Sequence, residues 1–264
     1  KFGGASVKDA AGVKNLSSIV HQQQGQLIVV VSAMGKTTNL LETLCNAYFH
    51  RDSKVPAIMK ELKDFHLNIV TSLFPLNAPV YKHLEELFIN LENILASESS
   101  LCYDYEYDRI ICFGELISTT IISDYMEMEG IENQFIDIRK FLKTDQNYRN
   151  ANIDLELSEQ LCKEAFDFNT SSTFVTQGFI AGTRTNQTTT LGREGSDYTA
   201  ALLANLLNAE NVTIWKDVPG VMNADPKEYE KAQVISRMSY KEAIELSHFG
   251  AKVIHPKTIK PIQN

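Results

Sequence analysis

Residues 191–204 read LGREGSDYTAALLA, which places two glycines, a cation and an acid at the predicted start of a helix. Residues 200–207 are almost entirely alanine and leucine, both strong helix formers. Ser196 and Asp197 come just before this run, and either side chain is suitable as the N-cap. The segment therefore predicts a helix that begins close to Ser196, after a glycine-containing turn.

The predicted turn has the properties of an anion-binding site. Unpaired backbone N–H groups and the positive end of the helix dipole face outward from a helix start. Gly192 and Gly195 allow the backbone to approach phosphate or carboxylate oxygens closely. Arg193 can add two parallel hydrogen bonds to a carboxylate. The segment alone is equally consistent with such a site and with an ordinary capped surface loop.

Composition restricts the class of protein and of ligand. The chain has 264 residues, of which 44% are hydrophobic and 22% charged, so it can bury the core of one large domain or of two closely packed lobes. Its formal net charge of -8 argues against a nucleic acid or an anionic membrane as partner. The longest apolar run, around residues 27–31, is too short to span a bilayer. We therefore expect a small-molecule ligand. The four cysteines, at positions 45, 102, 112 and 162, include no Cys-x-x-Cys pair and predict free thiols in a reducing cytosol, so we expect a cytoplasmic protein.

Alternating apolar runs and helical patterns predict the fold. Residues 27–31 form a continuous apolar run, typical of a parallel strand covered on both faces. Further strands are predicted at residues 135–138, 174–179 and 211–215. Helices are predicted at about residues 8–24, 39–50, 56–72, 79–97, 105–129, 154–167, 197–208 and 239–247. This order predicts an α/β fold with a mostly parallel sheet, in which the long helical block forms a cap or a subunit interface.

Three other segments place glycines or polar residues near predicted strand ends, where ligands of open parallel sheets bind. Residues 1–6 read KFGGAS, residues 32–39 read SAMGKTTN and residues 215–227 read WKDVPGVMNADPK. The second segment is reminiscent of a P-loop, but that motif needs a glycine at the position of Val30. The first and third segments are also compatible with plain turns.

A fourth segment, FGE at residues 113–115, interrupts a helix-prone stretch. Glycine in a helix costs about 1 kcal/mol relative to alanine, so either close packing or a ligand should explain Gly114. Packing is the simpler explanation. The alternative is a ligand site in which Glu115 binds an amino group.

Six segments resemble, in order and spacing, the catalytic domain of aspartokinases within the amino acid kinase family. They are KFGGASV, VSAMGKTTNLL, FGE, TLGREGSDYTAALLA, WKDVPGVMNADP and SHFGAKVIHPKTI. The segment from Ser239 onward also resembles the kinase part of bifunctional aspartokinase/homoserine dehydrogenases. The resemblance implies a three-layer αβα sandwich, the amino acid kinase fold. It also implies an amino-acid-binding lobe at about residues 1–190 and a nucleotide-binding lobe at about residues 191–264.

The resemblance implies that the γ-phosphoryl group of ATP is transferred to the side-chain carboxylate of L-aspartate, the first step of lysine, threonine and methionine biosynthesis. That carboxylate has an ordinary pKa of about 3.9, so it is already nucleophilic at neutral pH and no general base is needed. The site must then align the reactants and neutralise charge in a loose, in-line transition state. Mg²⁺ is expected mainly on the ATP phosphates, with no protein ligand assigned.

By the same resemblance, Lys1 contacts the transferring phosphoryl group and Asp197 holds the cations in place. Arg193 binds the α-carboxylate of aspartate, and Glu115 binds its ammonium group. The other implied contacts are Thr38 and Ser196 on the aspartate side, and Gly3, Gly4, Ser32, Lys216, Asp217, Met222, Lys227 and Lys252 around ATP.

Departures from the family pattern fall mainly in the nucleotide region. Lys216 stands where many relatives have threonine, and Met222 and Lys227 stand where they often have tyrosine and arginine. Family members usually continue into regulatory ACT domains, which are expected to be missing from this chain. The intact protein is expected to be a homo-oligomer.

Two alternatives remain open. Another amino acid kinase, acting on glutamate, acetylglutamate or a nucleotide, would share the fold, although an acetylated substrate lacks the ammonium that Glu115 would bind. A non-catalytic nucleotide-binding or interaction module would be consistent with the departures in the nucleotide region. A dinucleotide site is disfavoured, because no Gly-x-Gly-x-x-Gly follows a predicted strand.

Overall fold

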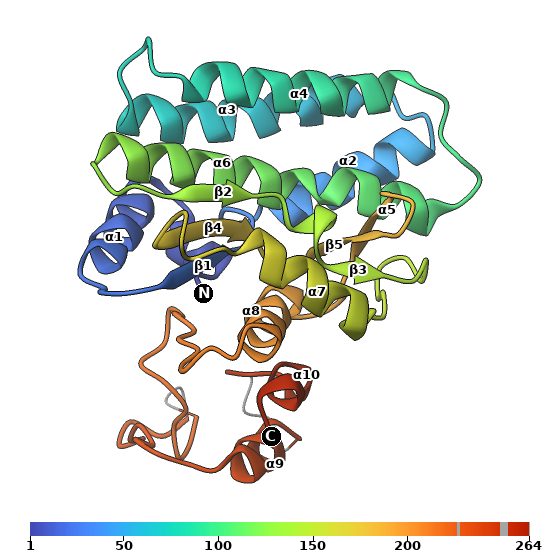
Figure 1. Ribbon diagram of the computed structural model, residues 1–264. Coiled ribbons are helices and arrows are strands. Elements are labelled where there is room, and N and C mark those ends of the chain that lie inside the picture. The colour runs from blue at the N-terminus through green and yellow to red at the C-terminus, as the bar shows by residue number, and fades with distance from the viewer. Residues whose placement is uncertain (226–227, 249–252, 264) are drawn as a thin grey trace.

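The computed structural model describes residues 1–225, 228–248 and 253–263, and its sheet lies between sets of helices (Figure 1). The α-helices are α1 (Ala10–His21), α2 (Thr37–Phe49), α3 (Val55–Leu73), α4 (Val80–Ala96), α5 (Tyr103–Ile111), α6 (Phe113–Met128), α7 (Leu155–Ala165), α8 (Gly195–Leu206), α9 (Tyr240–His248) and α10 (Pro256–Ile259). The strands are β1 (Leu27–Val31), β2 (Gln134–Ile136), β3 (Lys143–Thr144), β4 (Thr173–Gln177), β5 (Ile180–Thr183) and β6 (Thr188–Thr190). Short 3-10 helices are η1 (Gly4–Val7), η2 (Ile138–Lys140) and η3 (Lys260–Ile262).

The central sheet has the strand order β1-β4-β2, and its strands are parallel. Phe2 extends this sheet beyond β1, because it forms parallel bridges with both Val31 and Trp215. A second, smaller sheet has the order β3-β5-β6, in which only the β5–β6 pair is antiparallel. The prediction of an α/β fold with a mostly parallel sheet is confirmed.

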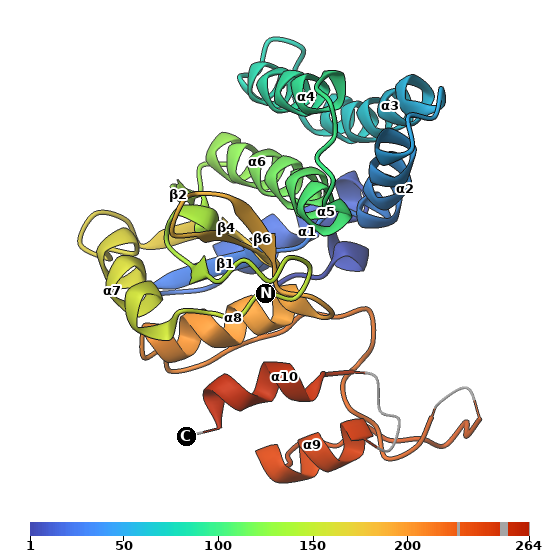
Figure 2. The same ribbon diagram turned by 90° about the vertical axis from the view of Figure 1, so that its right-hand side faces the viewer.

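Helices cover both faces of the central sheet, as Figures 1 and 2 show from two directions. α6 packs on β1, β2 and β4 from one side, and α8 contacts β1 from the other. α4 packs on α6 in turn, so α6 is enclosed between the sheet and another helix, and most of its residues are buried. This enclosure explains why buried residues lie on all sides of α6, instead of forming one stripe along the helix.

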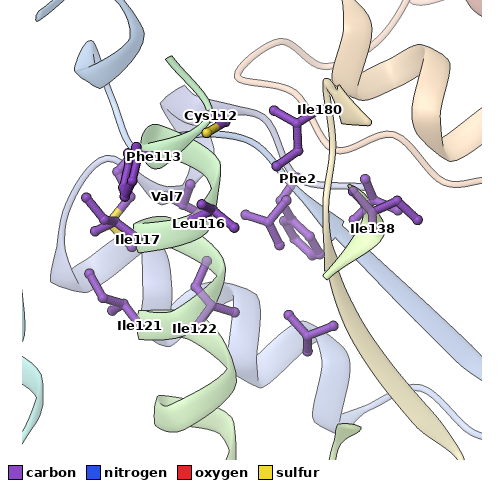
Figure 3. Close-up of a cluster of buried hydrophobic side chains, with 14 of the residues drawn as sticks. Phe2, Val7, Cys112, Phe113, Leu116, Ile117, Ile121, Ile122, Ile138 and Ile180 are labelled. Carbon is purple, nitrogen blue, oxygen red and sulfur yellow. The ribbon is translucent and has the colours of Figure 1, made fainter. Parts of the chain in front are cut away.

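The core between α6 and the sheet anchors the beginning of the chain. Figure 3 shows Phe2 in one buried cluster with Leu116 and Ile122 of α6, and Phe2 is only 5% exposed. The backbone of Phe2 is also fixed, since its N–H donates to the carbonyl of Val30 at 2.9 Å. Burial of a phenylalanine ring contributes about 1.5–3 kcal/mol. The residues on either side of Phe2 are therefore held firmly at the edge of the sheet.

The predicted helix over residues 105–129 forms two helices, α5 and α6, which meet at Cys112. Gly114 lies within the first turn of α6, and a Cβ there would be 2.9 Å from the Cβ of Ala33. That contact is too short for any larger residue, so close packing is sufficient to explain the glycine.

The strand predicted at residues 211–215 does not form as an element, because only Trp215 makes a bridge, to Phe2. Three short strands, β3, β5 and β6, were not among the predicted ones. They have two to four residues each and are rich in threonine, so they lack the apolar run that marks β1.

Candidate active site

A pocket of about 510 Å³ opens at the carboxyl end of the central sheet. Its walls include Ser32, which follows β1, and Phe179, which follows β4. This is the edge at which ligands of open parallel sheets bind. The predicted site residues that line the pocket are Lys1, Gly3, Gly4, Ser32, Thr38, Glu115, Arg193, Ser196, Asp197, Lys216 and Asp217.

Three predicted site residues are not among the described residues that line this pocket. Met222 forms an isolated antiparallel bridge with Val234 and does not belong to the described pocket lining. Lys227 and Lys252 lie outside the described residues. Nucleotide contacts by these three residues stay predictions.

One buried carboxylate in the pocket contacts two lysines. Oδ1 of Asp197 is 2.6 Å from Nζ of Lys1, and Oδ2 is 2.7 Å from Nζ of Lys216. The Asp197 side chain is 1% exposed. Burial opposes its ionisation, but the two ammonium groups outweigh burial and hold the pKa of the Asp197 carboxyl below its usual range. Asp197 is therefore ionised at neutral pH, and it is suited to orienting cations rather than to accepting a proton.

Lys216 belongs to this ion-pair cluster and also approaches Glu194, whose Oε2 lies 3.4 Å from the lysine Nζ. Burial alone would lower the pKa of the Lys216 ammonium, but the carboxylates of Asp197 and Glu194 outweigh that effect and raise it. Lys216 is therefore a permanent cation next to Lys1. Two lysine ammonium groups are thus held together at Asp197 in the pocket.

Glu115 offers a buried carboxylate with an unused oxygen. It lies in the first turn of α6 and is 3% exposed. Its Oε1 accepts a 3.1 Å hydrogen bond from the N–H of Ala33, whereas no described residue donates to its Oε2. Burial raises the pKa of the Glu115 carboxyl to about 8, despite the opposing effects of that N–H and of Lys1. Because an unpaired buried acceptor is costly, this position suits a donor or cationic group of a ligand.

Close packing shapes the loop that precedes α8. The N-cap of α8 is Glu194, which has a left-handed φ of 55° and makes no side-chain capping bond. The predicted cap at Ser196 or Asp197 is therefore wrong. Both residues lie in the first turn and face the pocket, where the lysines occupy the Asp197 carboxylate. A Cβ at Gly195 would lie 2.6 Å from the ring of Phe179, so the loop can pass this close only with glycine.

The segment after Lys1 and the loop after β1 touch at Gly4. A Cβ at Gly4 would be 2.6 Å from the carbonyl oxygen of Ala33, and the N–H of Gly35 donates to the Gly4 carbonyl at 2.9 Å. Gly3 and Gly4 both line the pocket next to Lys1. The glycine pair therefore lets the two loops meet. Because glycine has no side chain, it also leaves the backbone accessible beside the Lys1 ammonium group.

The structure adds pocket residues that the sequence analysis missed. The larger ones are Tyr107, Arg149, Phe179, Glu194 and Trp215. Glu194 and Trp215 are the direct neighbours of Arg193 and Lys216, so their position in the motifs was a usable signal. Arg149 lies in a polar stretch between predicted elements and gives no such signal.

The pocket lining combines both signs of charge, because it includes the two lysines, the exposed Arg193 and the buried Asp197 and Glu115. In the part of the chain that the structure describes, no group of three or more His, Cys, Asp or Glu side chains could hold a metal ion. Across the same ranges, every helix is too short or too polar to cross a membrane.

Known proteins similar to this chain have related sequences and structures. Lysine-sensitive aspartokinase 3 of Escherichia coli is 35% identical over 265 residues, which are 99% of this chain and 58% of that protein. The chloroplastic bifunctional aspartokinase/homoserine dehydrogenase 1 of Zea mays is 33% identical over 99% of this chain and 29% of its own length. The crystal structure of E. coli aspartokinase III with aspartate and ADP matches with a TM-score of 0.87 and 32% identity, over 98% of this chain and 58% of that one.

The chain thus spans between about a third and three fifths of the relatives it matches. The sequence model that describes the amino acid kinase family matches residues 1–264. Together with the parallel sheet and the pocket at its carboxyl edge, this match shows that the chain belongs to the amino acid kinase family.

Proposed function

We propose that the chain is the catalytic part of an aspartate kinase, which transfers the γ-phosphoryl group of ATP to the side-chain carboxylate of L-aspartate. The observation that carries this proposal is the pairing, in one pocket, of a two-lysine cluster with a buried, half-unsatisfied Glu115. The similarity to aspartokinases, one of them crystallised with aspartate and ADP, supports the same assignment.

The acceptor end of the pocket has the charges that a free amino acid requires. The ammonium group of aspartate would take the open Oε2 of Glu115, which is buried and has no described donor. Arg193 is exposed at the same pocket and would bind the α-carboxylate with its planar guanidinium. Thr38 and Ser196 line the pocket and would supply neutral hydrogen bonds. These contacts leave the side-chain carboxylate free to react.

The phosphoryl end requires positive charge where the transition state develops negative charge. Lys1 and Lys216 would face the phosphates, with Asp197 fixing their separation and the amides of Gly3 and Gly4 beside them. Ser32 and Asp217 line the same pocket and belong to the proposed nucleotide contacts. Mg²⁺ would be held mainly by the ATP phosphates and would supply further charge neutralisation there.

The chemistry follows from these positions. An oxygen of the aspartate side-chain carboxylate attacks the γ-phosphorus, the bond to the bridging oxygen breaks, and its electron pair leaves on ADP. The nucleophile is ionised at neutral pH, so no residue has to remove a proton. This agrees with the depressed pKa of the Asp197 carboxyl, which makes it a poor base. Catalysis would rest on alignment and on fixed positive charge.

The amino-acid-binding lobe would cover about residues 1–190 and the nucleotide-binding lobe about residues 191–264. The protein would act in the cytoplasm in the biosynthesis of lysine, threonine and methionine, as a homo-oligomer. Met222, Lys227 and Lys252 would contribute to nucleotide binding.

A hydroxylamine trap tests the reaction, because hydroxylamine converts an acyl phosphate into a hydroxamate, which forms a coloured complex with ferric iron. The protein is incubated with ATP and Mg²⁺ and with L-aspartate, L-glutamate or N-acetyl-L-glutamate in parallel. We expect hydroxamate with aspartate only. Product with glutamate or acetylglutamate would instead indicate another amino acid kinase, and no product with any acceptor would favour a non-catalytic nucleotide-binding module.

A further inference from the structure

Arg149 brings another guanidinium to the pocket, from the loop between β3 and α7. One face of α5 lies against the side chain of this arginine. The guanidinium carbon lies 4.4 Å from the ring centre of Tyr107 and 5.9 Å from that of Tyr103. Its Nη1 is 3.2 Å from Oδ1 of Asp104. Aromatic faces hold a guanidinium by cation–π attraction and leave its edge free for hydrogen bonds to a ligand.

The backbone of Arg149 is fixed more firmly than its side chain. Its φ is 65°, a left-handed conformation that costs a non-glycine residue energy. The buried carboxylate of Asp108 compensates, because its Oδ2 accepts the Arg149 N–H at 3.0 Å and the Thr190 N–H at 2.9 Å. The loop is therefore tied both to α5 and to β6. A strained arginine held in this way at a pocket points to a role in that pocket.

The loops that carry Arg149 and Arg193 are joined to each other. The ammonium of Lys257 donates to Oδ1 of Asn150 at 3.0 Å and to the carbonyl of Leu191 at 2.7 Å. A Cβ at Gly192 would lie only 3.1 Å from the Arg149 carbonyl oxygen. Each arginine is thus next to a residue that contacts the other loop, and the two guanidinium groups share one pocket.

The ion pair that Arg149 makes in the structure is easily exchanged. The side chains of Arg149 and Asp104 are 44% and 53% exposed, and such exposed pairs contribute little to stability. A carboxylate bound inside the pocket would meet a less hydrated guanidinium and gain more from the contact. Arg149 can therefore leave Asp104 for a ligand anion at small cost.

We propose that Arg149 is a second carboxylate-binding arginine, which together with Arg193 holds the α-carboxylate of the amino acid substrate. This inference rests on the proposed aspartate kinase function. A carboxylate has about four lone-pair sites, so it can accept hydrogen bonds from two guanidinium groups at once. Arg149 would bind and orient the substrate at the end away from the reacting carboxylate, and it would take no part in proton or phosphoryl transfer.

The positive φ at Arg149 offers a variant that separates binding from folding. Arg149→Gly removes the guanidinium and also relieves the backbone strain, so the folded state should be retained. Arg149→Lys keeps the charge but loses the planar fork. Arg184→Ala is the matched control, since Arg184 is an exposed loop arginine that pairs with Asp154 outside this pocket. Thermal unfolding of each variant checks that it is folded.

The test measures steady-state kinetics of hydroxamate formation with these variants. We expect Arg149→Gly to raise the KM for L-aspartate by roughly 10-fold to 100-fold, with the kcat and the KM for ATP changed less than threefold. Arg149→Lys should fall in between, and Arg184→Ala should match the wild type. The inhibition constant of L-aspartic acid α-amide, which lacks the α-carboxylate charge, should differ less than threefold between wild type and Arg149→Gly.

The outcomes separate this inference from the proposed function. An unchanged aspartate KM in Arg149→Gly, or an equal weakening of the α-amide, would overturn the role of Arg149 while the kinase activity of the wild type stands. Absence of hydroxamate from the wild type would instead defeat the proposed function. In that case, calorimetric titration of L-aspartate into the wild type and Arg149→Gly still decides the matter, and equal affinities or no binding would reject the inference.

Discussion

Two buried carboxylates line the same pocket and have opposite environments. Asp197 is 1% exposed and has a lysine on each oxygen, whereas Glu115 is 3% exposed and has one oxygen without a described donor. The pKa of the Asp197 carboxyl is accordingly lowered, and burial raises that of Glu115 to about 8. Asp197 has partners for both oxygens within the protein, whereas Glu115 has one oxygen that a ligand would complete. Under the proposed function, Asp197 would organise the site and Glu115 would recognise the substrate.

The largest effect is expected from breaking the Asp197 cluster at Lys1. Lys1→Ala should lower kcat by roughly 100-fold to 1000-fold, because the lysine would neutralise charge that develops only in the transition state. Steady-state kinetics with saturating aspartate and ATP measure this effect. Lys14→Ala removes a lysine from the exposed face of α1 and is the control, with unchanged kcat. A folded Lys1→Ala protein with near-normal kcat would remove Lys1 from the mechanism.

A smaller and different effect is expected at Glu115. Glu115→Gln keeps the shape and can still accept the Ala33 N–H, but it loses the charge that an ammonium group requires. The KM for aspartate should rise by about 10-fold to 100-fold, while the affinity for ATP, measured by calorimetry, is retained. Glu106→Gln changes another buried glutamate, one that pairs with Arg109 outside the pocket, and should leave the aspartate KM unchanged. Loss of ATP affinity in Glu115→Gln would contradict the assignment of Glu115 to the aspartate-binding part of the pocket.

The smallest effect concerns pH. The folded protein without ligand keeps the Glu115 proton up to about pH 8, above the ordinary carboxyl value of 4.5. Binding the ammonium of aspartate requires the ionised form, so binding should release a proton and strengthen by at most about tenfold between pH 7 and pH 8. Calorimetry in buffers of different ionisation enthalpy counts the released proton. Equal proton release by Glu115→Gln would assign the proton to another group.

The same raised pKa predicts the sign of a stability effect. Between about pH 4.5 and pH 8, the folded state binds the Glu115 proton and the unfolded state does not, so this residue lowers stability as the pH rises through that window. Glu115→Gln should remove this contribution. The thermal unfolding midpoint of the variant should therefore rise relative to that of the wild type as the pH increases toward 8.

The sequence predicted the parallel sheet from local patterns, and it predicted most of the pocket residues through their resemblance to aspartokinase motifs. The β-branched run of β1 and the glycine-containing turn before α8 are visible without knowledge of their neighbours. The N-cap of α8 could not be predicted, because Asp197 is drawn away from capping by Lys1 and Lys216, which are distant in sequence. Arg149 was missed for the same reason, as its neighbours come from α5 and from the loop before α8.

Phe2 makes the pocket depend on a pairing between distant parts of the chain. It pairs in parallel with Val31 on one side and with Trp215 on the other, so it joins segments from nearly opposite ends of the described chain. Closing such a long loop is entropically expensive and slow compared with forming helices. Lys1 and Lys216, each adjacent in sequence to one of these partners, can meet at Asp197 only once that pairing is made. The charge cluster at Asp197 is therefore local in space but built from residues that only a long-range pairing brings together.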